Sequence, residues 1–281
     1  MKKKRIKIAM AQMKVVGGAF KQNMHRAVSM IKNASEKNCD IVVLPECIDL
    51  GWTYPDAPIL ALPIPGKSSD MLCKNAQNLK IYIVAGLTEK DNDKIYNSAI
   101  LISPEGEIIL KHRKINILEI AQNIYSIGNS LSVADTALGK IGINICADNF
   151  PDSLVLGHSL FRMGADMLLS PSSWAVESDE EAEKSPLGLK MWRNTYTTLA
   201  YYYSGAVIGV SNVGYIHAGV WKGKKCIGNS LAVGPDGNIL AEGPYGEDAE
   251  KLIIVSVNIV QKNITGTAIA EMLKEKGYEG P

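Results

Sequence analysis

The 281-residue chain carries 30 lysine and arginine residues against 29 aspartate and glutamate residues, a formal net charge of +1. That balance provides no overall field to attract nucleic acid or an anionic membrane, and no run approaches the roughly 18 consecutive apolar residues of a membrane span. We therefore expect neither partner. With 46% hydrophobic residues, the chain has enough apolar material for a sizeable core.

The predicted elements of the first half alternate between strands and helices. In chain order they are a strand at 5–11, an amphipathic helix around 24–34, a buried strand at 40–46, a helix at 69–79, a strand at 81–87 and a hairpin at 97–114. Hydrophobic residues recur at helical spacing in the first helix and run continuously in the strands. Pro104 and Gly106 supply the angles of the hairpin turn.

The second half repeats this order. KIGINICA (140–147) resembles RIKIAMAQ (5–12), ADMLLSPS (165–172) resembles CDIVVLPE (39–46), and NSLAVGPDGNIL (229–240) resembles NSAILISPEGEIIL (97–110). Three matches in the same order indicate an internal duplication. Two half-sheets that each keep helices on one face would pack their other faces together. The sequence therefore predicts the α/β class, as a duplicated four-layer α–β–β–α sandwich.

No serine- and glycine-rich linker separates the two halves. We therefore expect a single domain over residues 1–281, with a C-terminal helical tail at about 266–281. The last predicted helix, at 268–276, lies outside the repeat and is a candidate for subunit contacts. The five cysteines (Cys39, Cys47, Cys73, Cys146, Cys226) are odd in number and widely spaced, and no apolar signal follows the N-terminal charges. These features favour a reducing cytoplasm, without disulfides or a cysteine metal site.

Two candidate reactive side chains follow predicted strands, where open α/β sheets place their ligand crevices. Cys146 precedes a helix expected to start at Pro151, and nearby backbone N–H groups at such a position favour a thiolate. The alternative is a buried structural cysteine. Glu46 follows an apolar run, where an unpaired carboxylate is costly to bury. It is either a strand-end residue that reaches solvent or a general base for a thiol.

A basic run, Lys111–Lys114, ends the return strand of the hairpin. Most such runs are solvated faces. Strand alternation, however, puts Lys114 on the same face as His112 and opposite Lys111 and Arg113. One face of this basic run can therefore point into a functional site.

Three segments resemble the signature segments of the nitrilase superfamily, in that family's order and with suitable spacing: LPE (44–46), HRK (112–114) and GINICAD (142–148). The similarity continues through FPD (150–152), SPSSW (170–174) and IGNSLAVGPDG (227–237). It implies the same sandwich fold and a carbon–nitrogen hydrolase. The resemblance also implies that Glu46 is the general base, Lys114 the cationic stabiliser and Cys146 the nucleophile, with no metal or organic cofactor. A homodimer or larger homo-oligomer is also implied.

The chain departs from the family pattern in two places. Ala147 follows Cys146 where many members have an aromatic residue, which reshapes the expected pocket. Many members also carry a second glutamate between the lysine and the cysteine. In this chain the only candidate is Glu119, which we assign a supporting catalytic role; a surface or loop-anchoring glutamate is the alternative.

Further pocket residues are expected around these three. Trp52 and Tyr54 follow Glu46 on a proline-rich loop, and Trp174 follows the strand that mirrors the Glu46 strand, with core packing as its alternative. Ala147 is expected to contact substrate. The stretch 221–225 (WKGKK) and Arg193 are candidates for attracting a substrate carboxylate, and a solvated loop is the alternative. His25, His158 and His217 show no metal-ligand spacing.

The leading functional hypothesis is hydrolysis of a small linear amide or N-carbamoyl compound through a cysteine thioester. The bond cleaved would be a carbon–nitrogen bond other than a peptide bond. A nitrilase or an acyltransferase would use the same three residues, and a non-catalytic nitrilase-like binding protein would keep the fold. A cysteine protease needs a histidine base, and none of the four histidines lies in a recognisable signature.

Overall fold

Two six-stranded sheets pack face to face in the computed structural model, which describes residues 3–260, 264 and 266–280. The first sheet has the order β15-β1-β2-β3-β4-β5, with β1 at Lys3–Gln12, β2 at Ile41–Val43, β3 at Tyr82–Asp91, β4 at Lys94–Ile102, β5 at Ile108–Arg113 and β15 at Lys251–Val260. The second has the order β14-β13-β10-β8-β7-β6, with β6 at Val133–Thr136, β7 at Gly139–Ile143, β8 at Met167–Ser172, β10 at Ala206–Ser211, β13 at Leu231–Val233 and β14 at Ile239–Glu242.

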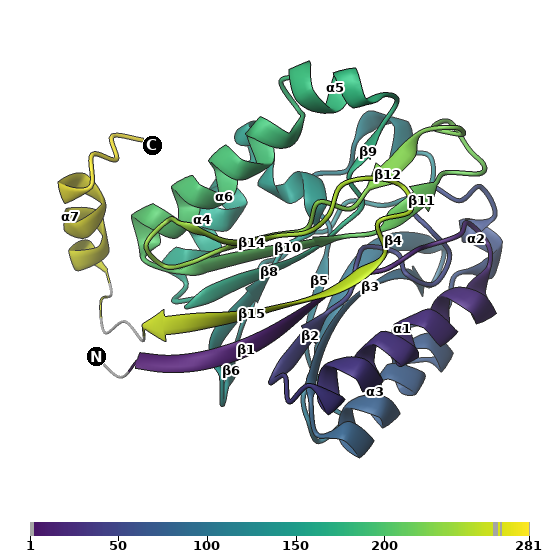
Figure 1. Ribbon diagram of the computed structural model, residues 1–281, viewed down its shortest axis with the longest axis horizontal. Helices are drawn as coiled ribbons and strands as arrows, with labels where there is room; N and C mark the ends of the chain where they lie inside the picture. The colour runs from purple at the N-terminus through teal and green to yellow at the C-terminus, as the bar shows by residue number, and fades with distance from the viewer. Residues whose placement is uncertain (1–2, 261–263, 265, 281) are drawn as a thin grey trace.

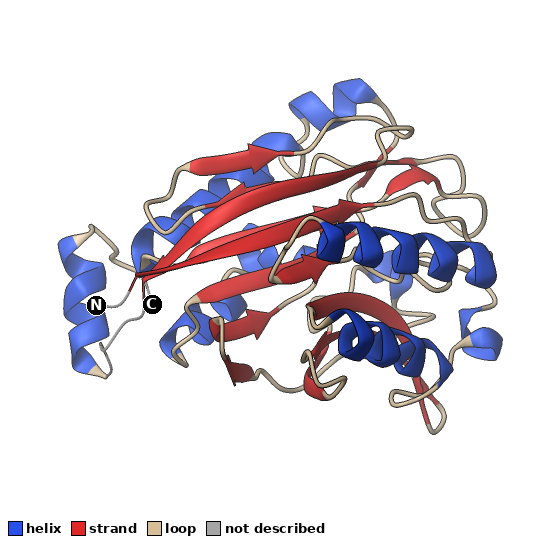
Figure 2. Cartoon of the chain, turned by 60° about the horizontal axis from the view of Figure 1, so that its bottom comes forward, coloured by secondary structure: helices blue, strands red, loops and turns tan. Residues whose placement is uncertain are grey.

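Helices cover both outer faces, so the layers run α–β–β–α (Figure 1). The first sheet is covered by α1 (Phe20–Glu36) and α3 (Lys67–Leu79), the second by α4 (Val155–Arg162) and α6 (Leu189–Tyr203). Shorter elements are α2 (Ala57–Leu60), α5 (Asp179–Lys184), the 3₁₀ turns η1 (Glu119–Ala121), η2 (Cys146–Asn149) and η3 (Pro151–Ser153), and a small sheet of β9 (Ala175–Val176), β11 (Val213–Tyr215) and β12 (Lys225–Ile227). Figure 2 shows the same layers from another side. The predicted sandwich is confirmed.

The hydrophobic core has an inner and an outer part, set by side-chain alternation along the strands. Between the sheets, Ile8 and Val84 of the first belong to the same buried cluster as Ile143 and Val207 of the second. On the outer face of the first sheet, alternate strand residues such as Ala9 and Val42 pack with one face of α1 and α3, which contributes Met24, Ile31 and Leu72. Full burial of one such side chain contributes about 1.5–3 kcal/mol.

The two sheets have the same topology, which is how the internal repeat folds. The order β15-β1-β2-β3-β4-β5 matches β6-β7-β8-β10-β13-β14 position by position, including which neighbours pair parallel and which antiparallel. The sixth strand of each half is exchanged. β6 follows β5 in the chain but pairs with β7, and β15 follows β14 but lies antiparallel to β1 along its whole length (Figure 1).

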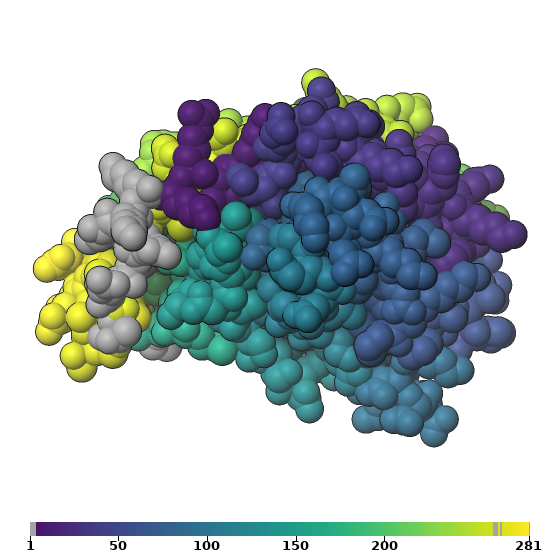
Figure 3. Space-filling view, turned by 90° about the horizontal axis from the view of Figure 1, so that it is seen from below, coloured from purple at the N-terminus to yellow at the C-terminus, as the bar shows by residue number. Residues whose placement is uncertain are grey.

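Two boundaries differ from the prediction. The expected strand at 40–46 ends at Val43, because Pro45 has no N–H to continue a ladder and Cys47 has a φ of 47°. The helix expected from Pro151 begins with the turn η3, and α4 starts only at Val155. The C-terminal helix α7 spans Thr267–Glu275 and lies at one end of the molecule (Figure 3). No helix within the described residues is long and apolar enough to cross a membrane.

Candidate active site

Glu46 lies in a turn that is held against the neighbouring strand β3. The N–H of Gly86 donates to the carbonyl of Pro45 at 3.0 Å, and the N–H of Ile48 donates to the carbonyl of Gly86 at 2.9 Å. A Cβ atom on Gly86 would lie only 2.6 Å from the Cα atom of Glu46. Glycine at position 86 therefore lets the turn approach the sheet closely enough to fix the Glu46 side chain.

Lys114 directly follows β5, and its backbone is anchored on both sides. Its N–H donates to the carbonyl of Asn97 at 2.8 Å, and its carbonyl accepts from the N–H of Gly128 at 2.8 Å. The Lys114 side chain is 2% exposed, whereas those of Lys111 and Arg113 are 33% and 24% exposed and form ion pairs with Glu89. The alternation along this basic run therefore follows the predicted pattern.

Cys146 is the first residue of η2, and two residues separate it from the end of β7. Its φ of 45° lies in the left-handed region, where a residue with a Cβ atom stores about 1–3 kcal/mol of backbone strain. The next N–H, that of Ala147, belongs to the first turn, where N–H groups have no partner within the helix. A strained turn thus presents both the thiol and a backbone donor.

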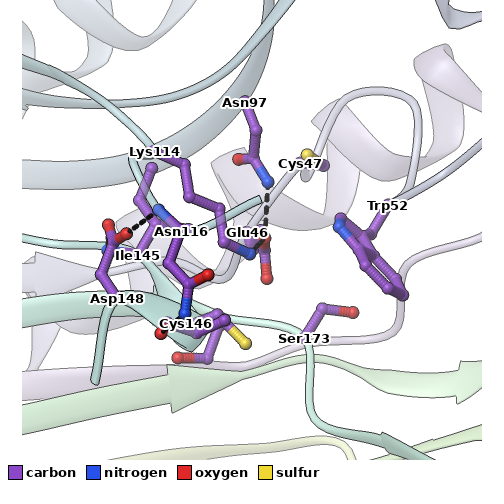
Figure 4. Close-up of polar contacts among 12 residues, drawn as sticks. Glu46, Cys47, Trp52, Asn97, Lys114, Asn116, Ile145, Cys146, Asp148 and Ser173 are labelled. Atoms are coloured by element: carbon purple, nitrogen blue, oxygen red, sulfur yellow. Dashed lines mark hydrogen bonds and ion pairs between the residues drawn. The ribbon is translucent and has the colours of Figure 1, made fainter. Parts of the chain in front are cut away.

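The three side chains meet at one point (Figure 4). Oε1 of Glu46 accepts hydrogen bonds from Nζ of Lys114 at 2.7 Å and from Nδ2 of Asn97 at 2.6 Å. Oε2 of Glu46 is buried and makes no hydrogen bond to a nitrogen or oxygen atom of the described residues. One carboxylate oxygen is therefore committed to the ammonium, while the other is available to accept a proton.

Charge and burial act on the thiol in opposite directions. Burial and the negative charge of Glu46 raise the pKa of Cys146 to about 12, although the charge of Lys114 lowers it. The expected effect of backbone N–H groups is present, since a backbone hydrogen bond at Ser173 lowers the pKa of Cys146, but burial and the carboxylate outweigh it. Burial lowers the pKa of Lys114, but Glu46 and Cys146 raise it more strongly, so the ammonium stays charged at neutral pH. The site holds a neutral thiol that requires a base.

Asp148 connects the segment of Lys114 to that of Cys146. Its Oδ2 lies 2.9 Å from Nε2 of His112 and accepts from the N–H of Ile145 at 2.9 Å. Its Oδ1 accepts from the N–H of Asn116 at 2.8 Å. Burial raises the pKa of Asp148, but the hydrogen bond and charge of His112 outweigh this and hold it below its usual range.

A cavity of about 300 Å³ opens above the thiol. Cys146 and Lys114 line it together with all four tryptophans of the chain, Trp52, Trp174, Trp192 and Trp221. The rings of Trp174 and Trp192 stack with centroids 4.5 Å apart, and Trp52 meets Trp221 edge-on at 4.8 Å. The thiol is therefore reached through a largely aromatic cavity.

The other predicted site residues have different positions. Trp52 and Trp174 line the cavity, as does Glu119, which is exposed and forms no side-chain hydrogen bond or ion pair within the described part of the chain. Tyr54 lies beside Gly17 and Gly18 and lines a separate, smaller cavity. Ala147 is completely buried and does not line the main cavity.

The basic residues considered as carboxylate anchors are engaged elsewhere. Arg193 forms an ion pair with Glu242 at 2.6 Å. In the stretch 221–225 only Trp221 lines the cavity, and Lys225 pairs with Asp179 at 2.5 Å. No group of three or more histidine, cysteine, aspartate or glutamate side chains among the described residues is placed to hold a metal ion.

Sequence reasoning missed several contributors. Asn97, which bonds Glu46, is a buried polar residue within β4, and its repetition at Asn229 in the matched segment was an available signal. Asp148 stood inside a signature segment without an assigned role. Trp192 and Trp221 carried no signal beyond their size, since their place in the cavity depends on how the α5–α6 region and the 221–225 loop fold over the sheet ends.

A duplicated α–β–β–α sandwich with a cysteine, a glutamate and a lysine gathered at its strand ends is the architecture predicted for a nitrilase-like chain. The model of the carbon-nitrogen hydrolase family matches residues 7–262. The chain therefore belongs to the carbon-nitrogen hydrolase family, within the nitrilase superfamily.

Individual relatives are more distant. The omega-amidase NIT2 of Xenopus tropicalis is 32% identical over 164 residues, which cover 54% of this chain and only 58% of the relative. A nitrilase of Pyrococcus abyssi is 28% identical over 263 residues, covering 91% of this chain and 92% of the relative. The structure of Saccharomyces cerevisiae Nit3, described as a member of branch 10 of the nitrilase superfamily, superposes with a TM-score of 0.74 at 23% identity, covering 98% and 96% of the two chains.

Proposed function

We propose that this protein hydrolyses the carbon–nitrogen bond of a small linear amide or N-carbamoyl compound, with Cys146 as nucleophile, Glu46 as general base and Lys114 as cationic stabiliser. The observation that supports this most is the Glu46 carboxylate. One oxygen is bound to the Lys114 ammonium at 2.7 Å and the other has no nitrogen or oxygen partner among the described residues, beside a neutral thiol that opens into a cavity. These are the groups that thiol-dependent acyl transfer requires.

In the first half-reaction, Oε2 of Glu46 takes the thiol proton as the sulfur attacks the substrate carbonyl carbon. The carbonyl π electrons move onto oxygen, and the oxyanion is stabilised by the Lys114 ammonium and the N–H of Ala147. Glu46 then gives its proton to the departing nitrogen. The carbon–nitrogen bond breaks, and an amine or ammonia leaves a thioester on Cys146.

In the second half-reaction, Glu46 takes a proton from a water molecule, whose oxygen attacks the thioester carbon. The carbon–sulfur bond breaks, the thiolate regains the proton from Glu46, and the acid is released. Glu46 thus acts as base and then as acid in each half-reaction. Glu119, at the cavity wall, is the candidate for a supporting role in binding the leaving group or the water.

The test is ammonia release from a panel of small amides, N-carbamoyl amines and nitriles. Wild-type protein and Cys73→Ala should turn over at least one amide or carbamoyl compound, while Cys146→Ala should be inactive. Cys73 is a matched control because it lies on α3 and lines no part of the cavity. Intact-mass spectrometry should show an acyl adduct that Cys146→Ala lacks. Normal turnover by that variant would contradict the proposal.

Other outcomes separate the alternatives. Release of ammonia only from nitriles would indicate a nitrilase. Transfer of the acyl group to an added amine in preference to water would indicate an acyltransferase. Binding without any turnover would indicate a non-catalytic member of the family. We also propose that the protein acts in the cytoplasm, which cell fractionation tests. We propose in addition that it forms a homo-oligomer, which light scattering of the purified protein tests.

A further inference from the structure

The cavity above Cys146 gathers the tryptophans of the chain. All four tryptophans line it, and Phe150, one of only three phenylalanines, packs edge-on against Trp192 at 5.5 Å. Aliphatic side chains complete the wall, including Leu118, Val176 and Leu189. Flat aromatic faces and aliphatic side chains favour apolar groups of a ligand.

The charges around the cavity are distributed unequally. Among the described residues that line it, Lys114 is the only basic one, and its ammonium is bound to Glu46. Two further carboxylates, Glu119 and Glu181, also line the wall. Glu181 accepts a hydrogen bond from the N–H of Glu177 at the start of α5, which fixes it near the cavity.

Two of the basic residues outside the cavity are paired with carboxylates. Lys225 pairs with Asp179 at 2.5 Å, and Arg193 pairs with Glu242 at 2.6 Å. Lys224 lies 4.4 Å from the ring centroid of Trp221, a residue whose side chain lines the cavity. A carboxylate on the substrate chain would leave water for a largely apolar wall. The described residues of that wall include no unpaired cation, and two of them are acidic. Such a transfer is strongly unfavourable.

From this distribution, and resting on the proposed function, we propose that the acyl group of the substrate is uncharged and apolar. An arylalkyl or medium-length aliphatic amide fits the cavity, and an amide whose acyl chain ends in a carboxylate is rejected. The tryptophan faces provide affinity for the acyl chain, while the absent counter-ion provides the discrimination.

Hexanamide and adipamate, the monoamide of adipic acid, form a matched pair of substrates. They have the same six-carbon chain and the same reacting amide, and differ only in a terminal methyl or carboxylate. We expect kcat/KM to be at least about 100-fold higher for hexanamide. Equal or faster turnover of adipamate would overturn the inference while leaving the proposed function intact.

Binding provides a readout that is independent of catalysis. In Cys146→Ala, intrinsic fluorescence arises only from the four tryptophans of the cavity and from the tyrosines. Hexanamide should change the tryptophan emission in a saturable way, and adipamate should do so only at concentrations about 100-fold higher. If wild-type protein turned over no amide or N-carbamoyl compound but this binding preference persisted, the proposed activity would fail and the substrate class would stand. Equal binding of both compounds would refute the substrate class.

Leu187 allows the electrostatic cause to be tested. It lines the cavity and is 53% exposed, so polar replacements there are compatible with folding. Leu187→Lys introduces a counter-ion, and Leu187→Gln is the neutral control of similar length. Relative to Leu187→Gln, we expect Leu187→Lys to reduce the preference for hexanamide about tenfold, with a smaller effect at high salt. An identical preference in both variants would rule out the missing counter-ion as its cause.

Discussion

Nε2 of His112 lies 2.9 Å from Oδ2 of Asp148, and both side chains are almost completely buried. His112 belongs to β5 in the first sheet, whereas Asp148 belongs to η2, which follows β7 in the second sheet. The same carboxylate also accepts from the N–H groups of Asn116 and Ile145. One buried group therefore fixes the segment that carries Lys114 relative to the segment that carries Cys146.

Asp148→Asn should uncouple these two segments. The amide places an N–H₂ group where a carboxylate oxygen accepted hydrogen bonds, so we expect a loss of about 3 kcal/mol in the free energy of unfolding. We also expect kcat to fall much more than KM rises, because Asp148 holds catalytic groups and does not line the cavity. Urea unfolding and steady-state kinetics measure the two effects.

The acid dependence of stability should change in the same variant. Since the pKa of Asp148 is depressed in the folded protein, its stabilisation is present above the unfolded pKa of about 4 and is lost as pH falls through the lower folded value. The stability gap between wild type and Asp148→Asn should therefore narrow only at strongly acidic pH. Asp152→Asn, at an exposed position nearby, is the control and should show no gap. A gap for Asp148→Asn that is constant with pH would contradict this assignment.

Glu46→Gln and Lys114→Met should each lower kcat by about 10²–10⁴-fold. Their effects on alkylation of the thiol should be opposite. Because the charge of Glu46 raises the pKa of Cys146 and that of Lys114 lowers it, Glu46→Gln should react faster with iodoacetamide at pH 8 and Lys114→Met should react more slowly. Peptide mass spectrometry follows alkylation at Cys146. Changes in the same direction would exclude this electrostatic account.

The fold followed from the sequence because its signals were local and repeated. The strand at 140–147 resembles that at 5–12, and the topology of the two sheets is indeed the same. The exchange of β6 and β15 was not predictable, because no local pattern shows which sheet an edge strand joins. The early end of β2 was readable in principle from Pro45.

The candidate site was predictable only where residues stood in recognisable segments. Glu46, Lys114 and Cys146 were found in this way, and the structure brings them together. The cavity wall was not predictable, because Trp192 and Trp221 reach it from segments whose placement depends on long-range packing. The net pKa of the thiol was also not predictable from the local pattern. Burial is a property of the whole fold, and it outweighs the backbone N–H groups that the local pattern suggested.

Asp49 should make the protein less stable as pH rises from 4 to 7. It is buried beside the Glu46 turn, and burial raises its pKa to about 6 despite hydrogen bonds from the N–H groups of Thr88 and Leu50. A raised folded pKa means that its stabilisation is present below the unfolded value and is lost as pH rises through about 6. Compared with wild type, Asp49→Asn should gain up to about 3 kcal/mol over this range and then level off. If the difference in unfolding free energy between wild type and Asp49→Asn did not change with pH, the raised pKa of Asp49 would be disproved.

Gly86→Ala should reduce activity without touching a reactive side chain. Its new Cβ atom would meet the backbone of Glu46 at 2.6 Å, so the Glu46 turn must move away from β3. Displacements of this kind cost up to about 10² in kcat. Gly157→Ala is the matched control, since its Cβ would instead crowd the side chain of Leu199 at 2.6 Å, on helix α6. Equal kcat values for the two variants would show that the close approach at Gly86 does not position Glu46.

The exchanged strands β6 and β15 predict that the two halves unfold together, as one domain. β15 pairs with β1 over the full length of both strands, yet Val257 of β15 is also buried in the core between the sheets. Neither half can therefore lose its structure without exposing apolar surface of the other.

Unfolding in urea should give the same midpoint with two probes at several protein concentrations. Tryptophan fluorescence reports on the cavity, and far-UV circular dichroism reports on the whole chain. Val257→Ala, which removes about 2 kcal/mol of core packing, should lower both midpoints equally. Two separate transitions, or a shift in only one probe, would show that the halves are independent domains.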